Sequence, residues 1–276
     1  MSGNMEGVQM EGLAVQEPQE TISFLVENLE IKINKGLCFR KVPALSRETF
    51  PLKVLVDLGT FAAFSKWVHD DKLPTLLAIY HENDGIFRYS GYVPGLMYRL
   101  AVYFELATLA DNVMDCVRKA HNSLGVGYTK AEVANIYQNQ LAHLGLALFA
   151  SLWIHLEDTR PNDFLKLTTK AERDDLMKNN VIAMDVALHR QPGYIGNQTR
   201  CFYHLHRYMI GWPCMRTHST DIRVWVLDKQ GVLHELQAWR AKTFLQPVKT
   251  ENDSNPEASE VLIHTGAYTN TDASSE

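Results

Sequence analysis

The stretch TISFLVENLEIKIN, residues 21–34, contains two short runs of strand character. The first run, TISFLV, is rich in β-branched and aromatic residues, and the second, LEIKI, alternates apolar and charged residues. Glu27 and Asn28 stand between them and suit a tight turn, so the stretch predicts an antiparallel hairpin. The following residues 35–45 predict a short helix that ends before Pro43, because a residue preceding proline avoids the helical conformation.

Beyond the hairpin, the hydrophobic period changes from strand-like to helical. LKVLVDL, residues 52–58, predicts a third strand that is mostly buried. Thr60 suits the N-cap of a helix that continues to about residue 71, where apolar residues recur at helical spacing. Residues 81–95 are rich in turn-forming residues and predict a loop.

The widest apolar stripe of the chain lies at residues 96–122. It predicts a helix buried on more than one side, with a break near Asp111. Thr129 and Glu132 have the spacing of a capping box and predict the start of the next helix. The remaining predicted elements are helices at 141–156 and 170–189, a strand at 222–227, and a return strand within 232–239.

The composition is that of a soluble globular protein, with 46% apolar and 21% charged residues. The net charge of −5 is unevenly distributed, because residues 1–20 hold four acids and residues 251–276 hold six, with no Lys or Arg in either. Both ends therefore read as solubilising, disordered tails. The body between them has a net charge of +5, which is too weak to indicate nucleic-acid binding by itself.

The sequence also bears on the compartment. Its start shows no basic region followed by an apolar core, so no secretory leader is predicted. The best apolar run, residues 141–154, is too short for a membrane span and suits a buried helix. The four cysteines are scattered, which favours a reducing compartment, the cytoplasm or the nucleus.

The order of these elements resembles the BTB/POZ domain, most closely that of fungal BTB/POZ proteins. The family has a second strand that leads into a His-Lys-x-Leu segment and a Ser-Pro-x-Phe-like element, and Asn34-Lys35-Gly36-Leu37 and Val42-Pro43-Ala44-Leu45 are similar to these. Residues 54–74 resemble the strand, helix and turn that follow, and residues 96–121 resemble the family's helix pair. The resemblance covers about residues 22–155, and Asn34 stands where the family usually has histidine.

The resemblance implies a fold and a role. The fold is α+β: a small BTB/POZ-like sheet covered by a helical cluster, then a mainly helical extension and a short C-terminal segment with Cys and His. The role is a non-enzymatic protein–protein interaction module, either a scaffold that forms homodimers or a substrate adaptor for a cullin-type ubiquitin ligase. The predicted divisions are an acidic tail at 1–20, the BTB/POZ-like domain at 21–125, a helical extension at 126–195, the Cys/His segment with a hairpin at 196–245, and an acidic tail at 246–276.

The Cys/His segment, CFYHLHRYMIGWPC at residues 201–214, carries the candidate site. Cys201, His204, His206 and Cys214 offer the four thiolate and imidazole ligands that a structural zinc ion takes. His204 and His206 can point to one side of an extended chain, because side chains alternate with a period of two. Fungal BTB/POZ proteins end in a segment similar to this one. The resemblance therefore supports a zinc site in addition to the spacing of the ligands.

A second interpretation of the same segment remains open. Its aromatic residues are numerous enough to fill a core, and buried Cys and His are common in packed structure. The alternative function is a zinc-containing regulator that binds nucleic acid and dimerises through the BTB-like part. The four arginines between residues 200 and 223 are too few to favour it. For partner contacts we expect the exposed parts of residues 60–71 and 96–122.

Overall fold

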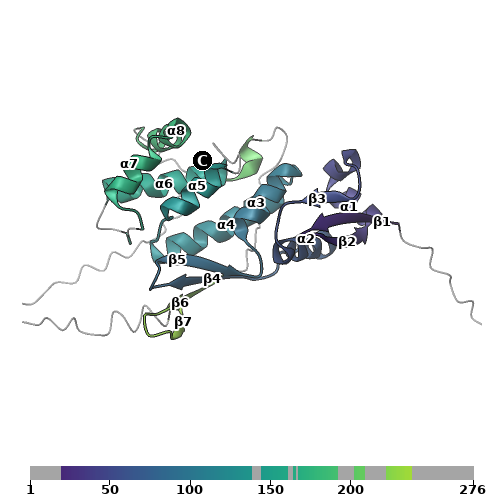
Figure 1. The fold of residues 1–276 in the computed structure, drawn as a ribbon, viewed down its shortest axis with the longest axis horizontal. Helices are drawn as coiled ribbons and strands as arrows, with labels where there is room; N and C mark the ends of the chain where they lie inside the picture. Colours follow the sequence, from purple (N-terminus) through teal and green to yellow (C-terminus); the bar gives the residue numbers. More distant parts are fainter. Residues whose placement is uncertain are drawn as a thin grey trace, which may run out of the picture.

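The computed structural model describes residues 20–138, 144–160, 164–165, 167–191, 202–208 and 222–237. In these residues the chain forms eight α-helices, two short 3-10 helices and two small sheets (Figure 1). Buried side chains from the helices and from both sheets join in one apolar core. The predicted combination of helices with a small sheet is therefore confirmed, and a second sheet is present in addition.

The first sheet contains the hairpin and has the order β2-β1-β3, with the strands β1 (Thr21–Val26), β2 (Leu29–Asn34) and β3 (Leu52–Val54). The predicted hairpin is confirmed, with Thr21 opposite Asn34 and Val26 opposite Leu29. Glu27 and Asn28 both have positive φ, at 46° and 69°, as a two-residue turn that matches strand twist requires. The predicted third strand is shorter than expected and runs parallel to β1.

Helices α1 (Lys35–Lys41), η1 (Pro43–Arg47) and α2 (Leu58–Asp70) accompany this sheet. The predicted end of α1 before Pro43 is confirmed. The N-cap of α2 is Asp57 and not Thr60 as predicted, because the Asp57 carboxylate accepts the backbone N–H and the hydroxyl of Thr60. A carboxylate is the better acceptor at a helix N-terminus, where the macrodipole favours negative charge.

The second sheet has the order β5-β4-β6-β7 and is formed by β4 (Leu76–His81), β5 (Ile86–Ser90), β6 (Ile222–Leu227) and β7 (Leu233–Glu235). The predicted loop at 81–95 is confirmed at the turn 82–85 and wrong at 86–90, because β5 forms an antiparallel hairpin with β4 there. The predicted hairpin after residue 222 is confirmed. Strand β6 pairs parallel with β4, which brings the C-terminal part of the chain against its first half.

The predicted helix at 96–122 is a helix pair, α3 (Pro94–Tyr103) and α4 (Ala107–Leu124). The break lies at residues 104–106 and not near Asp111, and Glu105 there has a left-handed φ of 57°. Asp111 instead lies within α4, on its buried side, with 2% of its surface exposed. A carboxylate buried in this way needs a polar or charged partner.

The remaining helices are α5 (Lys130–Gln138), α6 (Gly145–Thr159), α7 (Lys170–Leu176), α8 (Asn180–His189) and η2 (Leu205–Tyr208). The predicted cap is confirmed, because the backbone N–H groups of Thr129 and Glu132 each donate to the side chain of the other residue at the start of α5. The run 170–189 is divided into two helices, since the side chain of Asn179 accepts the backbone N–H of Val181 and starts α8.

Within the described part of the chain, no helix is both long enough and apolar enough to cross a membrane. The division boundaries near residues 125 and 195 stay predictions. The described part of the predicted Cys/His segment packs on α4, and β6 does so as well. The C-terminal elements are therefore attached to the first half of the chain through α4 and β4.

Candidate metal centre

Three potential metal ligands, Asp111, His204 and His206, lie together between α4 and the segment 202–206. One ligand atom of each lies within 4.8 Å of those of the other two. Asp111 and His204 are 2% exposed, and the side chain of His206 is 10% exposed. Buried groups of this chemistry are hydrogen-bonded to one another or bind a metal. The group could hold a metal ion.

Helix α4 presents two carboxylates to this segment. Asp111 and Asp115 are four residues apart and so share one helix face. Asp111 accepts the backbone N–H of Leu205 on Oδ1 and contacts Nδ1 of His206 through Oδ2, both at 2.5 Å. Asp115 pairs with Nε2 of His204 at 3.0 Å through Oδ1. Each imidazole is thus held by one carboxylate, and we call these four side chains the Asp/His cluster.

Aromatic packing fixes the chain beside the cluster. The Arg118 guanidinium lies 5.1 Å from the ring centre of Tyr203 and 3.7 Å from the Asp115 carboxylate. Tyr203 also meets Phe149 of α6 edge to face. Gly145 allows this approach, because a Cβ there would lie 1.8 Å from the backbone oxygen of Tyr203. The histidines are therefore presented by a chain that is packed against both α4 and α6.

The chemistry of the cluster suits a borderline divalent ion. Zinc accepts imidazole nitrogen and carboxylate oxygen, commonly in a tetrahedral shell. Imidazole binds a metal through one nitrogen while the other usually donates to a carboxylate, which fixes the tautomer. In the cluster, the bond from Nε2 of His204 to Asp115 would leave Nδ1 as the nitrogen with the lone pair.

The sequence prediction of the site is met in part. His204 and His206 come together, with ring centroids 5.3 Å apart. Cys201 and Cys214 lie outside the described residues, and their place in the site stays a prediction. Asp111 and Asp115 were missed. The signal for them was present, because two acids four residues apart interrupt the apolar stripe of a buried helix.

Two further buried histidines, His189 and His121, lie away from the cluster. His189 is buried against Ser151 and the carbonyl of Leu148, and burial lowers its pKa to about 4. His121 of α4 is enclosed by aromatic rings from β5, α6 and Tyr128, and its Nδ1 contacts the Val126 carbonyl at 2.8 Å. Both are structural core histidines.

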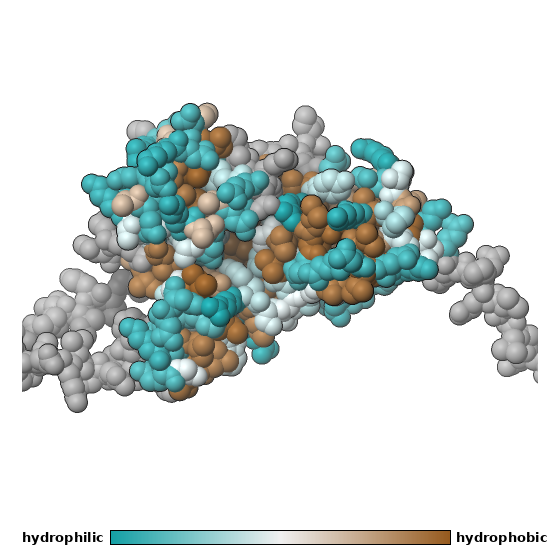
Figure 2. Space-filling model, viewed as in Figure 1, coloured by the Kyte–Doolittle hydropathy of each residue, from teal (hydrophilic) through white to brown (hydrophobic). Residues whose placement is uncertain are grey.

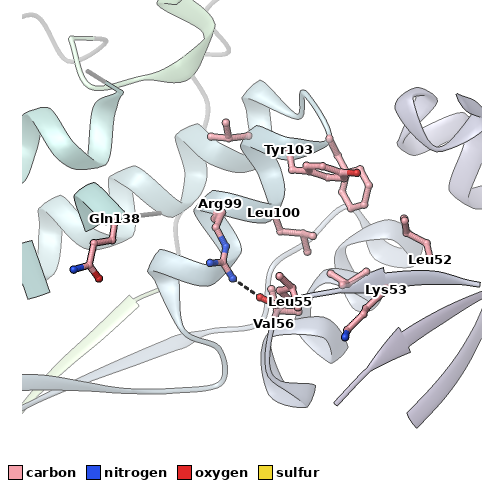
Figure 3. A pocket seen from close by; sticks show the side chains of 11 residues that line it. Leu52, Lys53, Leu55, Val56, Arg99, Leu100, Tyr103 and Gln138 are labelled. Carbon is pink, nitrogen blue, oxygen red and sulfur yellow. Dashed lines mark hydrogen bonds between the residues drawn. The ribbon is translucent and has the colours of Figure 1, made fainter. Parts of the chain in front are cut away.

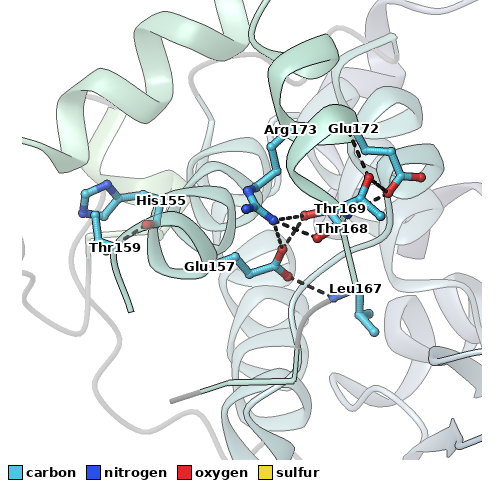
Figure 4. A network of polar contacts seen from close by, with 8 residues as sticks. All are labelled: His155, Glu157, Thr159, Leu167, Thr168, Thr169, Glu172 and Arg173. Carbon is cyan, nitrogen blue, oxygen red and sulfur yellow. Dashed lines mark hydrogen bonds and ion pairs between the residues drawn. The ribbon is translucent and has the colours of Figure 1, made fainter. Parts of the chain in front are cut away.

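A second polar network is built around Glu157 of α6 (Figure 4). Glu157 accepts the Thr168 hydroxyl and the Leu167 backbone N–H, and Arg173 lies 3.6 Å from it. Burial raises the pKa of Glu157, while these hydrogen bonds and Arg173 lower it. Arg173 also donates to the carbonyl of Thr168 at 2.7 Å, so the network fastens residues 167–168 between α6 and α7. It is a structural anchor.

Comparison with known proteins found no matching family model, no similar curated protein and no similar solved structure. The BTB/POZ resemblance stays a prediction that the sequence motifs carry.

Proposed function

We propose that this protein is a non-enzymatic interaction module of the BTB/POZ type, which binds partner proteins as a scaffold or as an adaptor for a cullin-type ubiquitin ligase. The observation that carries the proposal is an apolar groove of about 470 Å³ between residues 52–56 and α3. Apolar atoms gather on this face of the molecule, over β3 and α3 (Figure 2). An exposed patch rimmed by polar residues is typical of a protein-binding site.

The groove combines exposed apolar side chains with two cations. Leu55 is 70% exposed and Tyr103 is 60% exposed, and both line it. Arg99 reaches across to donate to the carbonyl oxygen of Leu55, while Lys53 lies at the opposite side (Figure 3). Tyr and Arg are enriched among the residues that dominate binding energy at interfaces. The surface is complementary to an apolar segment flanked by acidic residues.

Strand β3 favours a partner in extended conformation. It is the last strand of the sheet order β2-β1-β3, and among the described residues no strand pairs with its outer edge. An open edge offers backbone donors and acceptors to an added strand, while adjacent pockets select the side chains of that strand. We therefore propose that an extended segment of a partner protein binds in the groove.

The order of elements supports the BTB/POZ part of the proposal. The hairpin β1-β2 is followed by α1, the proline-led η1, the strand β3, the helix α2 and the helix pair α3-α4. This is the order that the sequence resemblance implies, with the β4-β5 hairpin inserted before the helix pair. Tyr103 and Arg99 also fall within residues 96–122, where partner contacts were expected.

The proposal includes one structural zinc ion, with Cys201, His204, His206 and Cys214 as its predicted ligands. The buried Asp/His cluster supports it, because two of the four predicted ligands meet there. A reducing compartment, the cytoplasm or the nucleus, suits thiolate ligands. It also suits Cys38 and Cys116, which are buried and form no disulfide.

The test compares groove variants with a matched surface variant. Full-length protein carrying Leu55→Asp or Tyr103→Asp is used beside Met184→Asp, since Met184 on α8 is 62% exposed and lies outside the groove. We expect both groove variants to lose at least about tenfold in the recovery of one captured partner, as measured by quantitative mass spectrometry, while Met184→Asp keeps it. Equal recovery by all four proteins would contradict the groove as a docking site.

Two further measurements separate the roles. Light scattering on the purified chain reports whether a second copy is the partner, in which case the groove variants become monomeric. Direct binding to the purified N-terminal domain of a cullin tests the adaptor role, and no binding at micromolar concentration contradicts it.

A further inference from the structure

Asp111 of α4 lies at the candidate metal centre, although it precedes His206 by 95 residues in the sequence. From the geometry of the Asp/His cluster, we infer that Asp111 is itself a ligand of the zinc ion and that Asp115 is a positioning residue for His204. The inference rests on the zinc ion of the proposed function. It places an oxygen ligand from a helix of the first half of the chain in the four-coordinate shell, in the position of one of the two predicted cysteine ligands.

The contact between Asp111 and His206 is the first support. Nδ1 of His206 and Oδ2 of Asp111 are 2.5 Å apart, and both are atoms with which zinc forms bonds. In a tetrahedral zinc shell, two such atoms lie about 3.3 Å apart, because each zinc–ligand bond is about 2.0 Å. The ligand atoms of the three residues already lie within 4.8 Å of one another, so adjustments of the order of an ångström would bring them around one ion.

The second support is the arrangement of hydrogen bonds behind the ligands. The backbone N–H of Leu205 donates to Oδ1 of Asp111, which orients the carboxylate and leaves Oδ2 to face His206. Asp115 pairs with Nε2 of His204 at 3.0 Å, and this contact orients the ring. Outer carboxylates of this kind orient ligating histidines in metal sites.

The third support is charge. Asp111 and Asp115 bring two negative charges to this buried place, and Arg118 brings one positive charge at 3.7 Å from Asp115. The neutral imidazole is the form that binds a metal, so a divalent cation between Asp111 and the histidines would be held by carboxylate charge as well as by nitrogen.

The consequence is a link between distant parts of the chain. An ion held by Asp111, His204 and His206 joins α4 to the segment that enters η2. An ion that binds the folded chain and not the unfolded chain stabilises the fold through its binding free energy. Zinc removal should therefore lower the melting temperature of the whole protein and not only release the C-terminal segment.

The experiment measures zinc on the purified full-length chain. Elemental analysis gives zinc per chain, and competition with a chromophoric chelator gives the affinity. The variants are Asp111→Asn, which keeps an acceptor for the Leu205 N–H but is a poor zinc ligand, and Asp115→Asn. The matched control is His234→Gln, because His234 also pairs with an aspartate, Asp228, at 2.7 Å on the distant β6-β7 hairpin.

We expect about one zinc per wild-type chain, a loss of affinity of at least about 100-fold in Asp111→Asn, and a loss of about 10- to 100-fold in Asp115→Asn. His234→Gln should bind as the wild type does. Wild-type affinity in Asp111→Asn overturns the inference and leaves the zinc proposal standing. A wild-type chain without zinc, and unable to bind added zinc, overturns both.

A second variant keeps the inference testable should Asp111→Asn fail to fold. Asp111→Glu retains the carboxylate but moves it by one methylene, so zinc binding should weaken without being lost. Substitution with Co²⁺ reports the ligand set through its visible absorption, which should differ between Asp111→Glu and wild type. An unchanged affinity together with an unchanged Co²⁺ spectrum contradicts a role for Asp111 as a ligand.

Discussion

Helix α4 carries a buried histidine environment at each end, and the two environments differ in the side chains that surround the histidines. Near its start, Asp111 and Asp115 meet His204 and His206. Near its end, His121 is surrounded by aromatic rings, here called the His121 cage: Phe87, Tyr128, Phe149 and Trp153. Burial there lowers the pKa of His121 to about 4, so the ring is neutral. A histidine among rings fills space, whereas histidines facing carboxylates have the chemistry of ligands.

The largest expected effect comes from the carboxylate end. Asp111→Ala leaves His206 and the Leu205 N–H without their buried acceptor, and we expect a loss of about 3–5 kcal/mol in the free energy of unfolding. Urea denaturation followed by tryptophan fluorescence measures it. Asp228→Ala removes the partner of His234 on the β6-β7 hairpin, where the side chains of Asp228 and His234 are 15% and 12% exposed, and should cost less. Similar losses of unfolding free energy in both variants would mean that the Asp/His cluster contributes no more to stability than the Asp228–His234 pair does.

The His121 cage predicts a pH dependence. The unfolded chain binds a proton at His121 near pH 6.5, but the folded chain does so only near pH 4. Stability from this group is therefore complete above pH 6.5 and falls as the pH drops to about 4, by up to about 3 kcal/mol. Replacing His121 by Phe should make the measured decline shallower across that range, and the burial of His189, whose pKa is also lowered to about 4, should account for part of the decline that remains. His69→Phe, at an exposed position of α2, should retain the wild-type decline.

The next effect tests how the carboxylate end is held in place. A Cβ at Gly145 would collide with the backbone of Tyr203, so Gly145→Ala should destabilise the protein by about 1–3 kcal/mol. Gly95→Ala on α3 is the matched control, because its added Cβ meets no atom within 4 Å. Thermal melts of both variants provide the comparison. A Gly145→Ala melt equal to the wild-type melt would mean that residues 202–206 do not pack tightly on α6.

The smallest expected effect concerns the cap beside the His121 cage. Thr129→Ala removes the reciprocal cap of α5 and should cost about 1 kcal/mol. Thr169→Ala removes the same capping box at α7 and should cost a similar amount in the same denaturation assay. A much larger loss for Thr129→Ala would show that the stacking of Tyr128 on His121 depends on this cap.

Local sequence chemistry predicted the elements whose signals lie within a few residues. The hairpin at 21–34 followed from alternation and a two-residue turn, and the start of α5 followed from the spacing of Thr129 and Glu132. The β4-β5 hairpin was missed. Its strand β4 pairs on its other side with residues 222–227, so its partner is distant in sequence. The turn-forming residues at 81–85 were a stronger sequence signal than the strand patterns on either side of them.

The candidate site likewise has a part that the local sequence predicted and a part that it did not. The sequence by itself determined that His204 and His206 would be neighbours, because two residues of separation keep them together. Only the tertiary structure decided that Asp111 and Asp115 face them, since helix α4 had to pack against a segment about ninety residues later. Local spacing sets which side chains a short segment presents. Burial of the apolar face of α4 sets which carboxylates meet those side chains, and that choice depends on the packing of the whole core.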